Sequence, residues 1–226
     1  MKKTIDKNKK GQGLSKTSRK KNLDFSLRKE WFPVNSPKEF GEKNIGITLA
    51  NRTSSLTKSL ENLKNRNYKV NLIDINSLEE SSHKKLIFRC YDFDTKSCLT
   101  TFYGMEIARD KFCSYIRKWQ TMIEVNSDIK TKDGYFLRIF AVAFSRKKRN
   151  QNKKTSYIKA SQIRTIRRKM VEIIAREGTS CTMKELIPKL ISEKLVDEIG
   201  FHGSKIYPLR NVIIKKVKLL EKPNEA

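Results

Sequence analysis

Histidine is scarce in this chain of 226 residues, which contains only His83 and His202, and neither has a partner at the spacing of metal ligands. An enzyme built on histidine acid–base chemistry is therefore not expected. The only Gly-x-Gly sequence, Gly11-Gln12-Gly13, stands in a lysine-rich segment rather than between a strand and a helix. Nucleotide hydrolysis is unsupported for that reason.

Paired cysteines and long hydrophobic runs are also missing. Cys90, Cys98, Cys113 and Cys181 lie far apart without a Cys-x-x-Cys pair, so the sequence predicts reduced thiols and no zinc ribbon. Residues 139–144 are among the longest apolar runs, far below the roughly 20 residues that cross a bilayer. The first thirty residues lack the apolar stretch of a secretory signal. We expect a cytosolic or nuclear protein without a metal or cofactor.

Acidic residues are absent from residues 135–170, although the window holds twelve lysines and arginines. Over the whole chain, 50 Lys+Arg and 24 Asp+Glu give a net charge of +26. Like charges at this density repel one another within the Debye length of about 8–10 Å unless a polyanion is present. Nucleic acid is therefore the expected partner. An anionic membrane would require an anchor helix or a lipidation signal, and neither is indicated.

Composition divides the chain into a basic tail at residues 1–22, a single domain at residues 23–222 and a short C-terminal tail at residues 223–226. The first segment has too little apolar surface to offset the entropy of ordering, so we predict that it is disordered until it lies along RNA phosphates. Its residues assigned to RNA contact are Lys9, Lys10, Arg19, Lys20 and Lys21.

Alternating apolar residues predict a series of half-buried strands in the first half of the domain. The predicted inward-facing sets are Ile45, Ile47 and Leu49, then Val70 and Leu72, then Leu86, Phe88 and Cys90, and finally the strand at residues 98–103. Residues 121–130 and 135–144 predict a hairpin, because Asp133-Gly134 suits the positive φ values of a tight turn. Its second strand is apolar on both faces except for Arg138, which predicts a central strand covered on both sides.

Helical periodicity appears mainly after the hairpin. Residues 106–117 predict a helix with an imperfect apolar stripe, and residues 156–177 predict a longer one. The predicted buried face of the longer helix consists of Ile163, Ile166, Met170, Ile173 and Ile174. Thr182-Met183-Lys184-Glu185 is a capping box that begins another helix, and residues 212–220 predict a closing strand. The residues alone therefore indicate a basic α+β nucleic-acid-binding domain.

Residues 146–169, which we call the basic strip, leave a predicted buried strand and enter the long helix. A charge run of this kind is often only a solvated face, but here no acid is present to pair with it, so we predict phosphate contacts. The assigned residues are Arg146, Lys147, Lys148, Arg149, Lys153, Lys154, Arg164, Arg167 and Arg168, with Tyr157 as a base-stacking or a packing residue. Trp119 is predicted to be a core residue.

A two-metal nuclease is an alternative that needs clustered acids. The acids available to it are Asp92, Asp94, Asp110, Asp128 and Asp133. Structural roles are favoured, because Asp133 suits its turn while Asp92 and Asp94 suit a strand end. An RNA-binding module that acts on its own is a further alternative.

Several short sequence segments point to a known family. They include Lys29-Glu30-Trp31-Phe32, residues 118–124 with the sequence Lys-Trp-Gln-Thr-Met-Ile-Glu, Asp133-Gly134-Tyr135, Lys154-Thr155-Ser156-Tyr157 and Ile206-Tyr207-Pro208-Leu209. Together they resemble the eukaryotic and archaeal small-subunit ribosomal protein family called S-one-e or S-three-a-e. The resemblance covers about residues 23–223 and is to a shortened eukaryotic member.

The resemblance implies an α+β fold with a mostly antiparallel, β-barrel-like core, flanking helices and a disordered basic N-terminal tail. It also implies a non-catalytic constituent of the small ribosomal subunit, on the platform near the rRNA 3′ end and the mRNA exit. Expected partners are small-subunit rRNA, neighbouring ribosomal proteins, initiation factor three and mRNA; no membrane contact or homo-oligomer is expected. The expected location is the cytoplasmic ribosome, with passage through the nucleus or nucleolus in a eukaryote.

Overall fold

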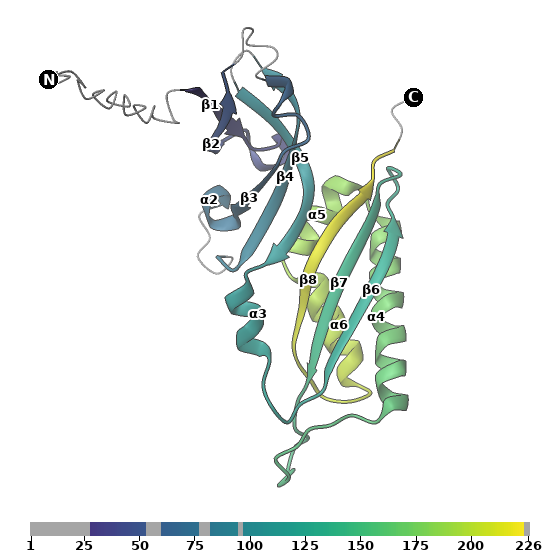
Figure 1. The fold of residues 1–226 in the computed structure, drawn as a ribbon. Helices are drawn as coiled ribbons and strands as arrows, with labels where there is room; N and C mark the ends of the chain where they lie inside the picture. Colours follow the sequence, from purple (N-terminus) through teal and green to yellow (C-terminus); the bar gives the residue numbers. More distant parts are fainter. Residues whose placement is uncertain (1–27, 53–59, 77–81, 95–96, 224–226) are drawn as a thin grey trace, which may run out of the picture.

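The computed structural model describes residues 28–52, 60–76, 82–94 and 97–223 (Figure 1). Its strands are β1 (Lys29–Asn35), β2 (Asn44–Asn51), β3 (Asn67–Asn71), β4 (Lys84–Asp94), β5 (Ser97–Ile107), β6 (Met122–Lys130), β7 (Phe136–Ser145) and β8 (Leu209–Glu221). Its helices are the short 3-10 helix η2 (Lys38–Phe40) and α2 (Leu72–Asn76), α3 (Arg109–Tyr115), α4 (Ala160–Ser180), α5 (Met183–Ile191) and α6 (Lys194–Ser204). The predicted disorder of residues 1–22 concerns residues outside the described part.

The strands form one mixed sheet in the order β2-β1-β5-β8-β7-β6, and β4 joins it by pairing with β3 and β5. Among the named strands of the described part, β1 and β5 pair in parallel, through Val34 and Cys98, and the other pairings are antiparallel. The α+β class with mostly antiparallel strands is therefore confirmed. Among the described strands the path runs from β2 to β6, and β4 and then β3 branch from it at β5.

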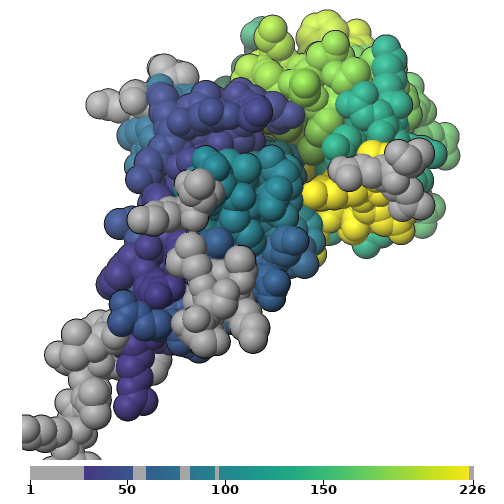
Figure 2. All heavy atoms as spheres, turned by 90° about the horizontal axis from the view of Figure 1, so that it is seen from above, coloured from purple at the N-terminus to yellow at the C-terminus, as the bar shows by residue number. Residues whose placement is uncertain are grey.

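Strand β5 joins the two halves of the molecule, which adjoin in Figure 2 as the purple and blue N-terminal strands and the green and yellow C-terminal part. Its connection to β8 consists of three register pairs, Gly104–Lys218, Met105–Val217 and Glu106–Lys216. At Gly104 the strands approach so closely that an added Cβ would lie 2.4 Å from the Val217 carbonyl oxygen. We call this short pairing the β5–β8 seam.

Most of the larger core lies between one face of β6–β8 and helices α4, α5 and α6, which lie behind the sheet in Figure 1. The same core continues into β3, α2, β4 and β5. Four of the residues predicted to form the buried face of α4 are buried: Ile166, Met170, Ile173 and Ile174. Ile163 is half-buried. The predicted capping box begins α5, where the Thr182 N–H donates to Glu185 Oε2 at 3.1 Å. The sequence therefore predicted this layer correctly, apart from α6, which it missed.

The smaller core, between β1, β2, β4 and β5, corrects one prediction. Alternation in β2 is present, but Ile47 and Leu49 are 65% and 39% exposed while Thr48 is buried. The reason is register: Thr48 pairs with the buried Phe32 of β1, and cross-strand partners share a face. Burial of Thr48 is possible because its Oγ1 accepts a hydrogen bond from Arg66 Nη1 at 2.8 Å.

Three predicted boundaries also change. Leu72 is the first residue of α2 rather than part of a strand. Helix α3 begins at Arg109 rather than at Glu106, because Glu106 pairs with β8. Helix α4 begins at Ala160, since Ser156 is held in an isolated parallel bridge with another part of the chain. In each case a long-range pairing or packing contact overrides local periodicity.

Strand β7 is central, as predicted, but it is not covered by other elements along its whole length. Phe136 and Phe140 are half-buried on the face opposite α4–α6, and the ammonium groups of Lys130 and Lys218 lie 5.3 and 5.7 Å from the centres of these two rings. Near Phe144, α3 covers this face through the ring of Tyr115, 6.4 Å away. Lysine side chains therefore replace a covering element there.

The turn between β6 and β7 contains Asp133-Gly134, as predicted, and spans residues 131–135. Only Gly134 has a positive φ, of 83°, and the loop is closed by hydrogen bonds between Thr131 and Tyr135. The Asp133 carboxylate instead accepts a hydrogen bond from the Met183 N–H at 2.8 Å. It thereby holds the start of α5 against the hairpin, which is a structural role.

Candidate nucleic-acid interface

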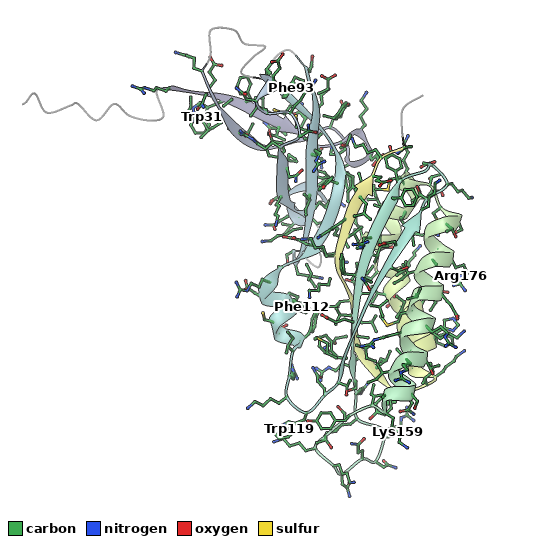
Figure 3. The ribbon with its side chains drawn as sticks, turned by 45° about the vertical axis from the view of Figure 1, so that its right-hand side comes forward. Trp31, Phe93, Phe112, Trp119, Lys159 and Arg176 are labelled. Atoms are coloured by element: carbon green, nitrogen blue, oxygen red, sulfur yellow. The ribbon has the colours of Figure 1, made fainter. Side chains whose placement is uncertain are left out.

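The basic strip forms one end of the molecule, where β7 leads through a loop into α4. Figure 3 marks this end with Lys159, at the start of α4, and with Trp119 nearby. The loop has defined backbone contacts: the Arg146 N–H donates to the Pro208 carbonyl at 2.9 Å, and Gln151 Oε1 accepts from the Lys148 N–H at 3.2 Å. The charges are therefore presented by an ordered backbone.

Every residue of the strip that the sequence assigned to RNA contact is exposed. These residues are Arg146, Lys147, Lys148, Arg149, Lys153, Lys154, Tyr157, Arg164, Arg167 and Arg168. Tyr157 is 60% exposed, so it is not a packing residue. The tail residues assigned in the same way, Lys9, Lys10, Arg19, Lys20 and Lys21, lie outside the described part. The loop and the first half of α4 thus gather ten of the assigned side chains at one end of the fold.

Ion pairing leaves most of this charge uncompensated. Two members of the acid-free window do find acids outside it: Arg138 pairs with Asp128 on β6, and Lys169 pairs with Glu172. Among the described residues, none of the nine assigned lysines and arginines makes an ion pair. Their neighbours within the described protein include aromatic rings, such as that of Tyr207 beneath the Lys148 ammonium, but no carboxylate within ion-pair distance.

Charge is unevenly distributed along α4. Its first turn contains no acid, and Lys159 at the N-cap makes no side-chain capping bond. Cations near a helix N-terminus oppose the helix dipole, whose positive end lies there. The second half is neutralised instead: Lys189 donates to Glu177 at 2.8 Å, and this hydrogen bond lowers the pKa of the Glu177 carboxyl. An anion bound near the first half of α4 would therefore offset the repulsion between these cations and the positive end of the helix dipole.

Trp119 corrects another prediction. It is 45% exposed rather than part of the core, and its φ of 72° lies in the left-handed region. The bridge between Gln120 and Ser156 fixes this part of the chain and turns the indole outward. Lys154 of the basic strip lies over the ring, with its ammonium 5.0 Å from the ring centre.

Three basic residues near Trp119 were missed by the sequence analysis. Arg117 and Lys118 precede it in the loop after α3, and Arg210 comes from the start of β8. Together with part of the strip they line a cavity of about 320 Å³. The Arg-Lys-Trp string in a loop is a signal that sequence analysis can use, whereas the approach of Arg210 is visible only in the fold.

The acids considered for a metal-dependent enzyme are dispersed. The Arg138 guanidinium holds the pKa of the Asp128 carboxyl below its usual value, Asp133 binds the start of α5, and Asp94 ends β4. Across the described ranges there is no group of three or more His, Cys, Asp and Glu side chains arranged to hold a metal ion. Nor does any helix there have the length and apolar character needed to span a membrane.

The four cysteines are free thiols. Cys90 and Cys98 are fully buried in β4 and β5, as expected for small apolar side chains in strands.

The fold and this surface define a basic α+β protein with an uncompensated cationic end on a rigid scaffold. The sequence pattern of the Ribosomal S3Ae family matches residues 17–223. The chain is also 43% identical to the small ribosomal subunit protein eS1 of Plasmodium falciparum (isolate 3D7) over 219 residues, which cover 97% of this chain and 84% of that protein. The chain belongs to the Ribosomal S3Ae family, and the resemblance seen in its short strings is confirmed.

Proposed function

We propose that this protein is a non-catalytic, structural constituent of the small ribosomal subunit that binds rRNA through the basic strip. The observation that carries the proposal is the convergence of nine exposed lysines and arginines, without acidic partners, from a loop and the first half of α4. Membership of a ribosomal protein family and the name of the Plasmodium relative support the ribosomal assignment.

The chemistry of the strip suits phosphate rather than base edges. Its charged groups extend from a loop and from one helix, so they are able to follow a backbone over several nucleotides. Contacts of this kind fix position and orientation without reading sequence. Each phosphate neutralised releases counterions, which makes the affinity depend on salt concentration. The nine assigned cations of the strip, none of which makes an ion pair, therefore support binding to folded rRNA.

The finer parts of the proposal follow the family resemblance. We place the protein on the platform, near the rRNA 3′ end and the mRNA exit, with neighbouring ribosomal proteins, initiation factor three and mRNA as contacts. Assembly support, a cytoplasmic ribosomal location and passage through the nucleus during assembly belong to the same proposal.

The test is the salt dependence of binding between the full chain and a small-subunit rRNA fragment. Replacing Arg164 and Arg168 together by glutamine is expected to lower the slope of log affinity against log salt by about 1.4–1.8, since each neutralised phosphate contributes about 0.7–0.9. Affinity for unrelated RNA sequences is expected to fall equally. The fold is expected to remain, because both side chains are exposed.

The matched control is the pair Lys169→Gln and Arg176→Gln on the same helix. It makes the same change in net charge, but both side chains already pair with acids, Lys169 with Glu172 and Arg176 with Glu198. The control is expected to change the salt slope much less. Equal slopes for the wild type and the Arg164/Arg168 variant, with circular dichroism unchanged, would show that the strip is only a solvated face.

A further inference from the structure

We propose that the cavity beside Trp119 is a binding site for one unpaired nucleotide of RNA, with its base stacked on the indole and its phosphate held by the surrounding cations. This inference rests on the proposed RNA-binding function and names a specific subsite within it. The cavity shares Arg146, Lys147 and Lys154 with the basic strip, but Trp119 and Arg210 lie outside the strip.

Convergence of charge around the cavity is the first observation. Three segments far apart in the sequence meet there: the loop after α3, the end of β7 with its following loop, and the start of β8. The six basic lining residues are Arg117, Lys118, Arg146, Lys147, Lys154 and Arg210. Among the described residues that line the cavity, none is acidic. The lining of this cavity therefore favours an anionic ligand.

The exposed indole is the second observation. Tryptophan is large and apolar, and it is usually buried apart from its N–H group. Here 45% of Trp119 is exposed, and its backbone adopts the left-handed conformation, at a φ of 72°, which a bulky residue rarely adopts. Strain of this kind persists only where surrounding contacts over-determine it, and it clusters at ligand-binding sites.

Those contacts are present, and the one between Ser156 and Ser145 is buried. The Trp119 carbonyl accepts hydrogen bonds from the Ser156 N–H at 2.8 Å and from Ser156 Oγ at 3.1 Å. Ser156 Oγ also lies 3.2 Å from Ser145 Oγ at the end of β7, and Gln120 Nε2 donates to the Tyr115 carbonyl at 2.8 Å. These hydrogen bonds fix the backbone that carries the indole, so its outward position is preorganised.

Size and chemistry select the ligand. A cavity of about 320 Å³ is at the lower end of the range for small-molecule sites, about 300–1,000 Å³, so it suits one nucleotide rather than a duplex. An unpaired base offers a flat π-face to an aromatic ring, and its phosphate offers the anion. Lys154 already lies at the ring, 5.0 Å from its centre. An acidic peptide would satisfy the cations but would leave the indole without a stacking partner.

Fluorescence provides a direct test with the full chain. The protein has two tryptophans, so the variant Trp31→Phe leaves Trp119 as the only indole. Figure 3 places Trp31 and Trp119 at opposite ends of the molecule. A single-stranded oligoadenylate of about six nucleotides is expected to quench Trp119. An abasic oligonucleotide of equal length is expected to cause little quenching, because it carries the phosphates without the bases.

Affinity measurements supply the second part of the test. Trp119→Ala is expected to weaken binding of the oligoadenylate about 5-fold to 150-fold, the loss of one stacked base, without changing the salt slope, since no charge is removed. Trp119→Tyr is expected to restore most of the affinity. The matched control Trp31→Ala, which removes the other exposed indole, is expected to have no effect. Trp119→Gly serves as a second deletion variant, because glycine accepts a positive φ without strain.

The outcomes separate this proposal from the preceding one. Unchanged affinity in both Trp119→Ala and Trp119→Gly, with the slope still lowered by the Arg164/Arg168 substitutions, would overturn the nucleotide site and leave strip binding intact. Quenching of Trp119 by polyglutamate as strong as that by RNA would assign the cavity to an acidic protein segment and overturn the proposal. Absence of RNA binding by the wild-type chain would overturn both proposals together.

Discussion

Substituting Gly104 by alanine tests whether the β5–β8 seam holds the two halves of the sheet together. The added Cβ would lie 2.4 Å from the Val217 carbonyl oxygen. Carbon and carbonyl oxygen normally approach to about 3.3 Å, so the strands would have to separate by about 0.9 Å. A hydrogen bond of about 2.9 Å would then exceed the usual limit of about 3.2 Å. The clash is with backbone, which no rotamer change relieves.

The expected cost combines two effects. Overpacking contributes about 1–3 kcal/mol, and each lost hydrogen bond in the three-pair seam contributes about 1 kcal/mol. We expect Gly104→Ala to lower the free energy of unfolding by about 2–4 kcal/mol. With a slope of about 2 kcal/mol/M, the urea midpoint would fall by about 1–2 M.

A glycine in α6 supplies the control. A Cβ at Gly200 would meet its nearest neighbour, Val212 Cγ2, at an ordinary 3.8 Å. Gly200→Ala is therefore expected to raise stability by about 0.5–1 kcal/mol, because alanine favours the helix. A urea midpoint for Gly104→Ala equal to that of the wild type would refute the reasoning about the seam.

Two further predictions concern charged side chains in the fold. Lys84 is only 8% exposed, and its Nζ donates to the Ile191 carbonyl and to Glu193, each at 2.7 Å. Lys84→Met is therefore expected to lower the free energy of unfolding, measured by urea titration, by about 1.5–3 kcal/mol. The control Lys85→Met is expected to change it little. Burial raises the pKa of the Glu106 carboxyl, but hydrogen bonds from Lys69 and Lys216 outweigh it, so the folded-state pKa is below the ordinary 4.5. These ion pairs therefore stabilise the protein above that pH, and their contribution is lost as the pH falls through the folded-state pKa. Across this pH range the urea midpoint is expected to fall less in Glu106→Gln than in the wild type. Parallel curves of urea midpoint against pH for the two proteins would contradict the assignment.

Periodicity correctly predicted the elements whose apolar residues fit only one orientation of the helix or strand. The α4 stripe and the β6–β7 hairpin fall into this group, because each pattern is long and its alternatives would expose several large side chains. In β2, by contrast, the alternation was right while the inward face was wrong. Both faces of β2 carry residues suited to a strand, and only the register with Phe32 decides that Thr48 points inward.

Helix α6 was missed for a different reason. It contains Gly200 and Gly203, which lower helix propensity. At Gly203 a Cβ would lie 2.4 Å from Leu209 Cδ1, so the glycine permits a close approach to the start of β8. The reason for this glycine can therefore be recognised only when the contact between α6 and β8 is known.

In the candidate site, too, some residues could be predicted from the sequence and others could not. The basic strip was predictable, because an acid-free window of twelve cations has few structural explanations. Trp119 was assigned to the core because most tryptophans are buried, and its outward position depends on the Ser156 hydrogen bonds across 37 residues of chain. Arg210 comes from β8 and reaches the cavity only in the folded protein. Long-range placement, rather than residue type, was the missing information.

Sedimentation of the tagged full-length protein from its own cells tests the central claim most directly. If the protein is a constituent of the small ribosomal subunit, it is expected in the small-subunit and polysome fractions, with mass spectrometry identifying the other small-subunit proteins beside it. Its position is expected to shift with the subunit when ribosomes are dissociated by removing magnesium. Recovery of the tagged protein only in the free fractions at the top of the gradient, with none in small subunits or polysomes, would contradict the account.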